Sequence, residues 1–113
     1  MSQASRGEIW LVNLDPTQGR EQAGTRPILI ISVNTFNHGA AELVVGVPIT
    51  SKAKGIPLHV EINSPEGGLN VKSFAKCEDV RSISTNRLVR KFGIVSSQTI
   101  EKVEDRLRIL LGL

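Results

Sequence analysis

The alternation of apolar and polar residues predicts a chain built mainly from short β-strands. Four runs of apolar, mostly β-branched residues are separated by segments rich in Pro, Gly and Asn: 8–14, 27–33, 42–50 and 57–62. The last run alternates most clearly, so we expect Val60 to face the core and His59 to face solvent. Gly46 and Pro48 interrupt the third run, which indicates a strongly bent strand.

A fifth strand is expected over residues 73–83, where strand geometry sends alternate side chains to opposite faces. In that arrangement Lys76 and Glu78 are neighbours on one face, and Asp79 points to the other. Cys77 shares the face of Asp79 and is expected to be a small core residue. A short helix is expected to follow, beginning near residue 84 and ending at Arg90.

The clearest helix lies at the C-terminus, where Ser96 or Ser97 supplies an N-cap. Apolar residues recur there along one helical stripe that we expect to pack on the sheet: Ile100, Val103, Leu107, Leu110 and Leu111. Glu104 and Arg108 are expected to form an i, i+4 ion pair on the solvated side. Many short strands and a late helix favour a mainly β fold, a small curved antiparallel barrel with short helices and a C-terminal helix. No repeat or linker divides the chain, so residues 1–113 are expected to form one domain, with residues 1–5 as a flexible tail.

Composition narrows the functional classes. Of the 113 residues, 40% are hydrophobic and 22% are charged, which is typical of a folded domain and not of a disordered chain. The formal net charge of +3 favours a polyanionic partner. One cysteine and two distant histidines offer no metal-ligand spacing, so we expect no metal and no cofactor. The polar N-terminus and the lack of an apolar run of bilayer length predict a cytoplasmic protein with no membrane partner.

Residues suited to binding a phosphate lie at the ends of predicted strands. Arg26 precedes an apolar run, and Pro27 biases it toward an extended conformation. Thr50 ends the bent strand and is followed by polar residues: Ser51, Lys52 and Lys54. Each feature alone also fits an ordinary structural role. Arg26 could be a solvated residue at a strand start, Thr50 and Ser51 could form a turn with side-chain-to-backbone hydrogen bonds, and Lys76 and Glu78 could be a surface ion pair. Their recurrence at strand ends indicates a common anion site.

Four segments, in their order and spacing, resemble the MazF/PemK family of toxin endoribonucleases: RGEIW at 6–10, GTRP at 24–27, VPITS at 47–51 and KCEDVRSI at 76–83. The resemblance runs from Arg6 to the C-terminus. It implies an SH3-like barrel that forms a homodimer and acts as the toxin of a type II toxin–antitoxin system. It also implies metal-independent, sequence-selective cleavage of single-stranded RNA, chiefly mRNA, and inhibition by a cognate acidic antitoxin.

The same resemblance assigns three catalytic positions. Arg26 matches the family's catalytic arginine, and Thr50 matches its catalytic threonine or serine. Glu78 stands where relatives carry a carboxylate, often Asp followed by Gln, so Glu78 and Asp79 both stay open as the base. Lys76 stands where some relatives have arginine. Residues 15–24 match a loop that closes over RNA, and the expected RNA contacts are Thr17, Gln18, Arg20, Thr25, Ser51, Lys52, Lys54 and Lys76.

The candidate residues suffice for RNA cleavage because RNA supplies its own nucleophile, the 2′-hydroxyl. An enzyme must align that group with phosphorus, remove its proton and stabilise charge on the phosphoryl oxygens. Glu78 is the candidate base, Thr50 donates a hydrogen bond to a non-bridging oxygen, and Arg26 binds the phosphate in a bidentate way. Lys76 or water protonates the leaving 5′-oxygen. The expected products carry a 2′,3′-cyclic phosphate and a 5′-hydroxyl.

Two functions of other classes compete with this hypothesis. A gyrase-inhibiting toxin of the CcdB type shares the barrel, but that resemblance depends on a C-terminal tryptophan, and this chain ends Leu111-Gly112-Leu113. A non-catalytic, basic barrel that only binds nucleic acid is the second alternative. The chain has no Tyr, one Trp and three Phe, so it offers few of the stacking platforms that single-strand binders use.

Overall fold

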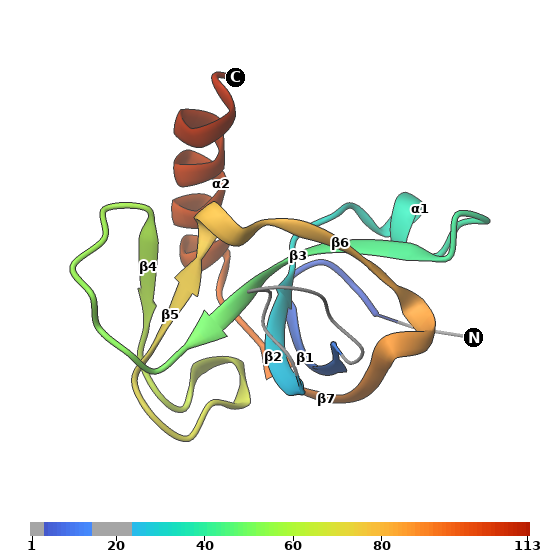
Figure 1. Cartoon of the computed structure of the whole chain (residues 1–113), viewed down its shortest axis with the longest axis horizontal. Helices are drawn as coiled ribbons and strands as arrows, with labels where there is room; N and C mark the ends of the chain where they lie inside the picture. Colours follow the sequence, from blue (N-terminus) through green and yellow to red (C-terminus); the bar gives the residue numbers. More distant parts are fainter. Residues whose placement is uncertain (1–3, 15–23) are drawn as a thin grey trace.

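The computed structural model describes residues 4–14 and 24–113, and these form a strongly curved sheet with a long C-terminal helix (Figure 1). The strands are β1 (Glu8–Asn13), β2 (Thr25–Ile30), β3 (Leu43–Thr50), β4 (His59–Ile62), β5 (Ser73–Lys76), β6 (Arg81–Ser84) and β7 (Leu88–Ile94). The helices are α1 (Asn34–Asn37) and α2 (Ser97–Leu111), with 3-10 turns η1 (Glu66–Gly68), η2 (Cys77–Asp79) and η3 (Thr85–Arg87). Of the expected RNA contacts, Thr17, Gln18 and Arg20 lie outside the described residues.

The pairing of the strands confirms the mainly β, antiparallel fold. Their order is β4-β5-β3-β2-β1-β7, and β6 pairs with β3. Within the described residues the ladder does not close, so the sheet curves like a barrel without becoming one. No described helix is long and apolar enough to cross a membrane.

Strand β3, whose interruptions predict a bend, joins the two halves of the sheet. Its first residues pair with β6, and its last two, Ile49 and Thr50, pair with β5. The crossing with β2 is tight at Gly46, where an added Cβ would lie 2.5 Å from the side chain of Ile28 and 2.8 Å from the carbonyl oxygen of Leu29. A glycine is therefore required where the strand turns from one half to the other.

Strands β1 to β3 are buried on both faces, which explains their nearly continuous apolar sequences. One core contains residues from these strands, from β4 and β5 and from α2, including Ile9, Leu29, Val47, Val60 and Val103. The other fills the concave side of the curved sheet and includes Ala4, Val12, Ile28, Val44 and Ile83. The polar residues at the ends of β2 and β3 are therefore attached to strands that are packed on both faces.

The prediction of one strand over residues 73–83 is wrong, because the chain turns a corner between β5 and β6. The pairings Gly46 with Arg81 and Ile49 with Ala75 leave two residues of β3, 47 and 48, opposite five residues, 76–80. The extra residues form η2, which breaks the strand alternation. The expected core position of Cys77 is nevertheless confirmed, since its side chain is fully buried.

The short helix expected up to Arg90 is also largely wrong. Only the turn η3 is helical, and the residues after it form β7 along the free edge of β1. Leu88 at the start of β7 packs against the second core, and Phe92 packs against the first. These long-range contacts decide the conformation against the local sequence signal.

Helix α2 is confirmed, but its stripe packs on the sheet only in part. Ser96 caps the helix by accepting a hydrogen bond from the backbone N–H of Thr99. Val103 is buried, whereas Leu110 is 38% and Leu111 is 56% exposed. Figure 1 shows the reason: the last turns of α2 rise beyond the edge of the sheet. The predicted pair of Glu104 and Arg108 is present at 3.9 Å.

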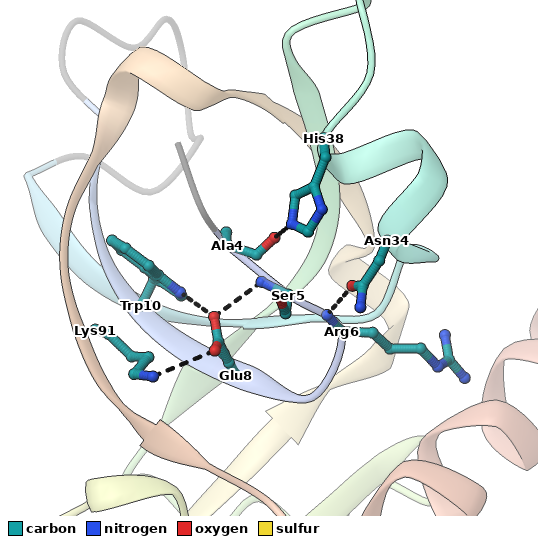
Figure 2. Close-up of polar contacts among 8 residues, drawn as sticks. All are labelled: Ala4, Ser5, Arg6, Glu8, Trp10, Asn34, His38 and Lys91. Carbon is teal, nitrogen blue, oxygen red and sulfur yellow. Dashed lines mark hydrogen bonds and ion pairs between the residues drawn. The ribbon is translucent and has the colours of Figure 1, made fainter. Parts of the chain in front are cut away.

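The N-terminal segment before β1 is held by polar contacts, so the expectation of a flexible tail is wrong for Ala4 and Ser5 (Figure 2). The carbonyl oxygen of Ala4 lies 2.8 Å from Nε2 of His38, and the backbone N–H of Ser5 donates to Glu8. Glu8 also accepts from Trp10 and pairs with Lys91. Burial raises the pKa of Glu8, but these hydrogen bonds outweigh that effect and lower the pKa below its ordinary value.

A second carboxylate ties η1 to the start of α2 and gives a test of stability. Glu66 accepts hydrogen bonds from the backbone N–H of Ser96 at 2.9 Å and the hydroxyl of Thr99 at 2.5 Å. Burial raises its pKa, yet the hydrogen bonds prevail and leave the pKa below the ordinary 4.5. Because the folded state prefers the ionised form, this stabilisation is present above pH 4.5 and is lost as the pH falls through the lower, folded-state pKa.

Glu66→Gln is therefore expected to lower the free energy of unfolding by about 1 kcal/mol at pH 7. The difference from the wild-type protein should shrink in denaturant melts below pH 4.5. Glu61→Gln serves as the control, because exposed Glu61 makes a single side-chain ion pair within residues 4–14 and 24–113, with Lys72 at 3.5 Å. A difference that stays constant across this pH range would contradict the role of the Glu66 charge.

Candidate active site

Most of the predicted phosphate-binding residues meet in one cleft of about 460 Å³. It lies where β2 begins and β3 ends, beside the loop after β3 and the start of β5. Its polar walls include Arg26, Thr50, Ser51, Lys52, Lys54 and Lys76. Among the described residues that line it, four are basic and none is acidic. The cleft is therefore suited to a polyanion.

Arg26 is placed at the edge of this cleft by the pairing of β2 with β1. It pairs with Val12, which is fully buried, and it is the last exposed residue of β2 before the strand enters the core at Ile28. Within the described part of the chain, the guanidinium has no ion-pair or hydrogen-bond partner. The backbone of Arg26 is thus anchored in the sheet, and its guanidinium is open to an external anion. Thr25, another expected contact, is also exposed and precedes Arg26, but it is not among the described lining residues.

Thr50 lies opposite Phe74 at the end of β3, and its hydroxyl has a defined orientation. The backbone N–H of Lys52 donates to Oγ1 of Thr50 at 3.2 Å. Since that bond uses a lone pair of the oxygen, the hydroxyl hydrogen is available to a ligand in the cleft. Ser51 and Lys54 are exposed beside it.

Because of the turn η2, the charged residues Lys76, Glu78 and Asp79 are arranged differently from the prediction. Lys76 lines the cleft, but its ammonium lies 2.8 Å from the carboxylate of Asp79, not beside Glu78. Glu78 lies outside the described lining and makes a 2.8 Å contact with Nε2 of His59. The expectation that Glu78 accompanies Lys76 while Asp79 points away is wrong, because the 3-10 turn brings residues i and i+3 together.

Residues 5–111, nearly the whole chain, match the family of the PemK-like, MazF-like toxin of type II toxin-antitoxin systems. The chain belongs to this family. It is 39% identical to "Endoribonuclease MazF9" of Mycobacterium tuberculosis over 113 residues, which covers 96% of each sequence. Its fold is similar to that of MazF from Deinococcus radiodurans, with a TM-score of 0.85, 28% identity and 97% of each chain covered. A MazE-MazF structure from the same organism gives a TM-score of 0.83 at 26% identity, covering 100% of this chain and 99% of that chain.

In this MazF-like chain, His59 is not the surface residue that the sequence suggests. Only 3% of its side chain is exposed, against 28% for Glu78. Among the described residues, no group hydrogen-bonds Nδ1 of His59 or Oε1 of Glu78. Alternation along β4 correctly places Val60 and Ile62 in the core but not His59, because η2 and α2 cover the face that would otherwise be solvated.

Cys77 does not add a nucleophile to the MazF-like site. Burial raises the pKa of its thiol to about 11, with a smaller contribution from the charge of Glu78. The residue therefore stays a protonated thiol at neutral pH.

Sequence reasoning missed the apolar wall of the cleft, which includes Leu69 and Phe92. Phe92 reaches the cleft because β7 is a strand, and the expected helix concealed this. In residues 88–94 the β-branched and aromatic residues only equal the good helix formers in number, so the local composition did not decide for a strand.

Proposed function

We propose that this chain is the toxin of a type II toxin–antitoxin system and an endoribonuclease that cleaves single-stranded RNA, chiefly mRNA, in the cytoplasm. The supporting observation is the cleft that combines Arg26, Thr50 and three lysines in a chain of the MazF-like family. A relative at 39% identity is named an endoribonuclease. A non-catalytic barrel would not need an arginine and an available hydroxyl in the same cleft.

In the proposed reaction the scissile phosphate sits between Arg26 and Thr50. The 2′-hydroxyl of the preceding ribose attacks phosphorus, and the 5′-oxygen leaves. The guanidinium binds two phosphoryl oxygens, and the Thr50 hydroxyl donates to an oxygen that gains charge in the transition state. Lys52 and Lys54 bind neighbouring phosphates and hold the strand across the cleft.

The test is to incubate the pure protein with a long single-stranded RNA in EDTA and to map the ends. We expect cuts at discrete sites, with 2′,3′-cyclic phosphate or derived 3′-phosphate ends and 5′-hydroxyl ends. EDTA should not change the yield, because the nucleophile belongs to the RNA and cationic side chains face the phosphate. Binding without cleavage would support the non-catalytic alternative. Inhibition of gyrase supercoiling without RNA cleavage would support the CcdB-like alternative.

The proton-transfer group is proposed from the geometry of η2. Glu78, the base suggested by the sequence, contacts His59, whereas Asp79 contacts Lys76, which lines the cleft. We therefore favour the pair of Lys76 and Asp79 for moving protons at the 2′- and 5′-oxygens. Glu78 remains the alternative, in which case the turn must open when RNA binds.

Asp79→Asn is accordingly expected to lower kcat by on the order of a hundredfold, the usual scale for general acid–base catalysis. Glu78→Gln should affect cleavage less, because glutamine can still bond to His59. Single-turnover rates on one RNA, with thermal melts of each variant, give the comparison. A larger loss in Glu78→Gln at equal stability would restore Glu78 as the base.

We further propose that the chain works as a homodimer and is inhibited by an acidic antitoxin. The family resemblance supports the dimer, and the structure described as MazE-MazF supports a protein partner. A cleft with four basic described residues offers an acidic peptide the same attraction as RNA, so inhibition should be competitive. Light scattering that returns a monomer, or an antitoxin that blocks cleavage without displacing RNA, would contradict these two proposals respectively.

A further inference from the structure

Strand β7 carries a stacked pair of side chains at the border of the cleft. The guanidinium carbon of Arg90 lies 4.7 Å from the centre of the Phe92 ring. Phe92 lines the cleft, and Arg90 is exposed. Within the described part of the chain, no carboxylate pairs with Arg90. The pair therefore presents a planar cation backed by an aromatic ring, next to the proposed phosphate site.

The strand pairing places Arg90 on the same side as the cleft. Leu11 of β1 pairs with Arg90 on one side and with Pro27 on the other. Directly paired residues of antiparallel strands share a face, so these three side chains form a row across β7, β1 and β2. Pro27 lines the cleft and follows Arg26. Two strand spacings, about 10 Å, separate the ends of this row.

The neighbouring cation, Lys91, faces the other way. It pairs with Trp10 in the ladder and binds Glu8 at 3.3 Å (Figure 2). Alternation along β7 thus separates two adjacent basic residues: Lys91 is in a structural network, and Arg90 borders the cleft.

The aromatic member of the pair has a fixed position. Gly68 of η1 lies so close to β7 that an added Cβ would be 2.1 Å from the carbonyl oxygen of Phe92. The Phe92 ring also packs partly against the first core. A preorganised ring and guanidinium lose little conformational freedom when a flat ligand stacks on them.

We propose that Arg90 and Phe92 form a stacking site for the nucleobase of a nucleotide that neighbours the cleaved phosphate. The chemistry is that of single-strand recognition, in which aromatic rings and arginine planes stack on unpaired bases. The phosphate on Arg26 and the base on this pair would together fix the strand's position in the cleft. This inference rests on the proposed RNA-cleaving function.

The test compares binding of two fluorescent ligands of equal length. One is a random pool of 2′-O-methyl RNA 12-mers, which cannot be cleaved, and the other is the same backbone without bases. In wild-type protein we expect the pool to bind about tenfold more tightly than the abasic chain. Arg90→Lys keeps the charge but loses the plane, and Phe92→Leu keeps an apolar side chain but loses the ring. Both should remove most of the preference for bases and change abasic binding little.

Lys91→Gln is the matched control, and it should weaken or spare both ligands equally. Equal weakening of both ligands by Arg90→Lys and Phe92→Leu, or no weakening, would overturn the stacking site. Arg90 is exposed, so Arg90→Lys keeps the test valid even if Phe92→Leu melts early. Cleavage of a long RNA is assayed in parallel. Base-dependent binding without cleavage supports the site but contradicts the proposed nuclease, whereas cleavage without base dependence contradicts the site alone.

Discussion

Arg26→Ala is expected to lower RNA cleavage by on the order of a hundredfold or more while leaving the fold intact, the scale seen when one donor to a developing negative charge is removed. The fold should survive because Arg26 is exposed and has no partner within the described residues. Neighbouring Ile28 to Ile30 hold β2 in the core without it. Single-turnover cleavage of a defined RNA measures the loss, and a thermal melt checks the fold.

Two further variants separate charge from geometry at this position. Arg26→Lys keeps the positive charge but loses the two-pronged donor, so it should recover RNA binding better than cleavage. Thr25→Ala changes the adjacent exposed residue and should cost much less. A well-folded Arg26→Ala protein with full activity would contradict the proposal that Arg26 stabilises the scissile phosphate. The cleft would then be only a binding surface.

The positions of Arg26 and Thr50 could be predicted from sequence because each lies next to a strong local signal. Arg26 precedes a buried run, and Thr50 ends one, so their positions at strand ends follow from apolar pattern and turn residues. Their meeting is a long-range property, since it needs β2 and β3 to pair with Leu29 opposite Val47. The family resemblance supplied that information.

The group around η2 could not be predicted by alternation. The period-two pattern of residues 73–83 is compatible with a strand, and the break arises only because the bent β3 pairs with β5 at one end and β6 at the other. Because of the turn η2, the carboxylate of Asp79 contacts the ammonium of Lys76, and the carboxylate of Glu78 contacts His59. The local pattern thus predicted that these charged residues lie close together but assigned the wrong carboxylate to Lys76. The choice of the catalytic base depends on that pairing.

A single 2′-deoxy substitution at the cut site is expected to abolish cleavage there while leaving binding nearly unchanged. The missing hydroxyl is the proposed nucleophile. Cys77 is fully buried and cannot replace it, and the proposed reaction uses the Thr50 hydroxyl as a donor to a phosphoryl oxygen. Binding should persist because Arg26 and the lysines contact phosphates, which the substitution retains.

The measurement uses matched oligonucleotides that differ in one ribose. Deoxyribose one position to either side of the cut serves as the control and should leave cleavage within a few fold, since those hydroxyls do not attack the phosphorus. Denaturing gels report the cut, and fluorescence anisotropy reports binding. If the deoxy substrate is still cut, or if fragments carry 5′-phosphates, a water molecule or a protein group must be the nucleophile. The attacking and leaving oxygens lie on opposite sides of the phosphorus. Arg26 and Thr50 would then have to bind the phosphate in another orientation, with the new nucleophile in line with the leaving oxygen.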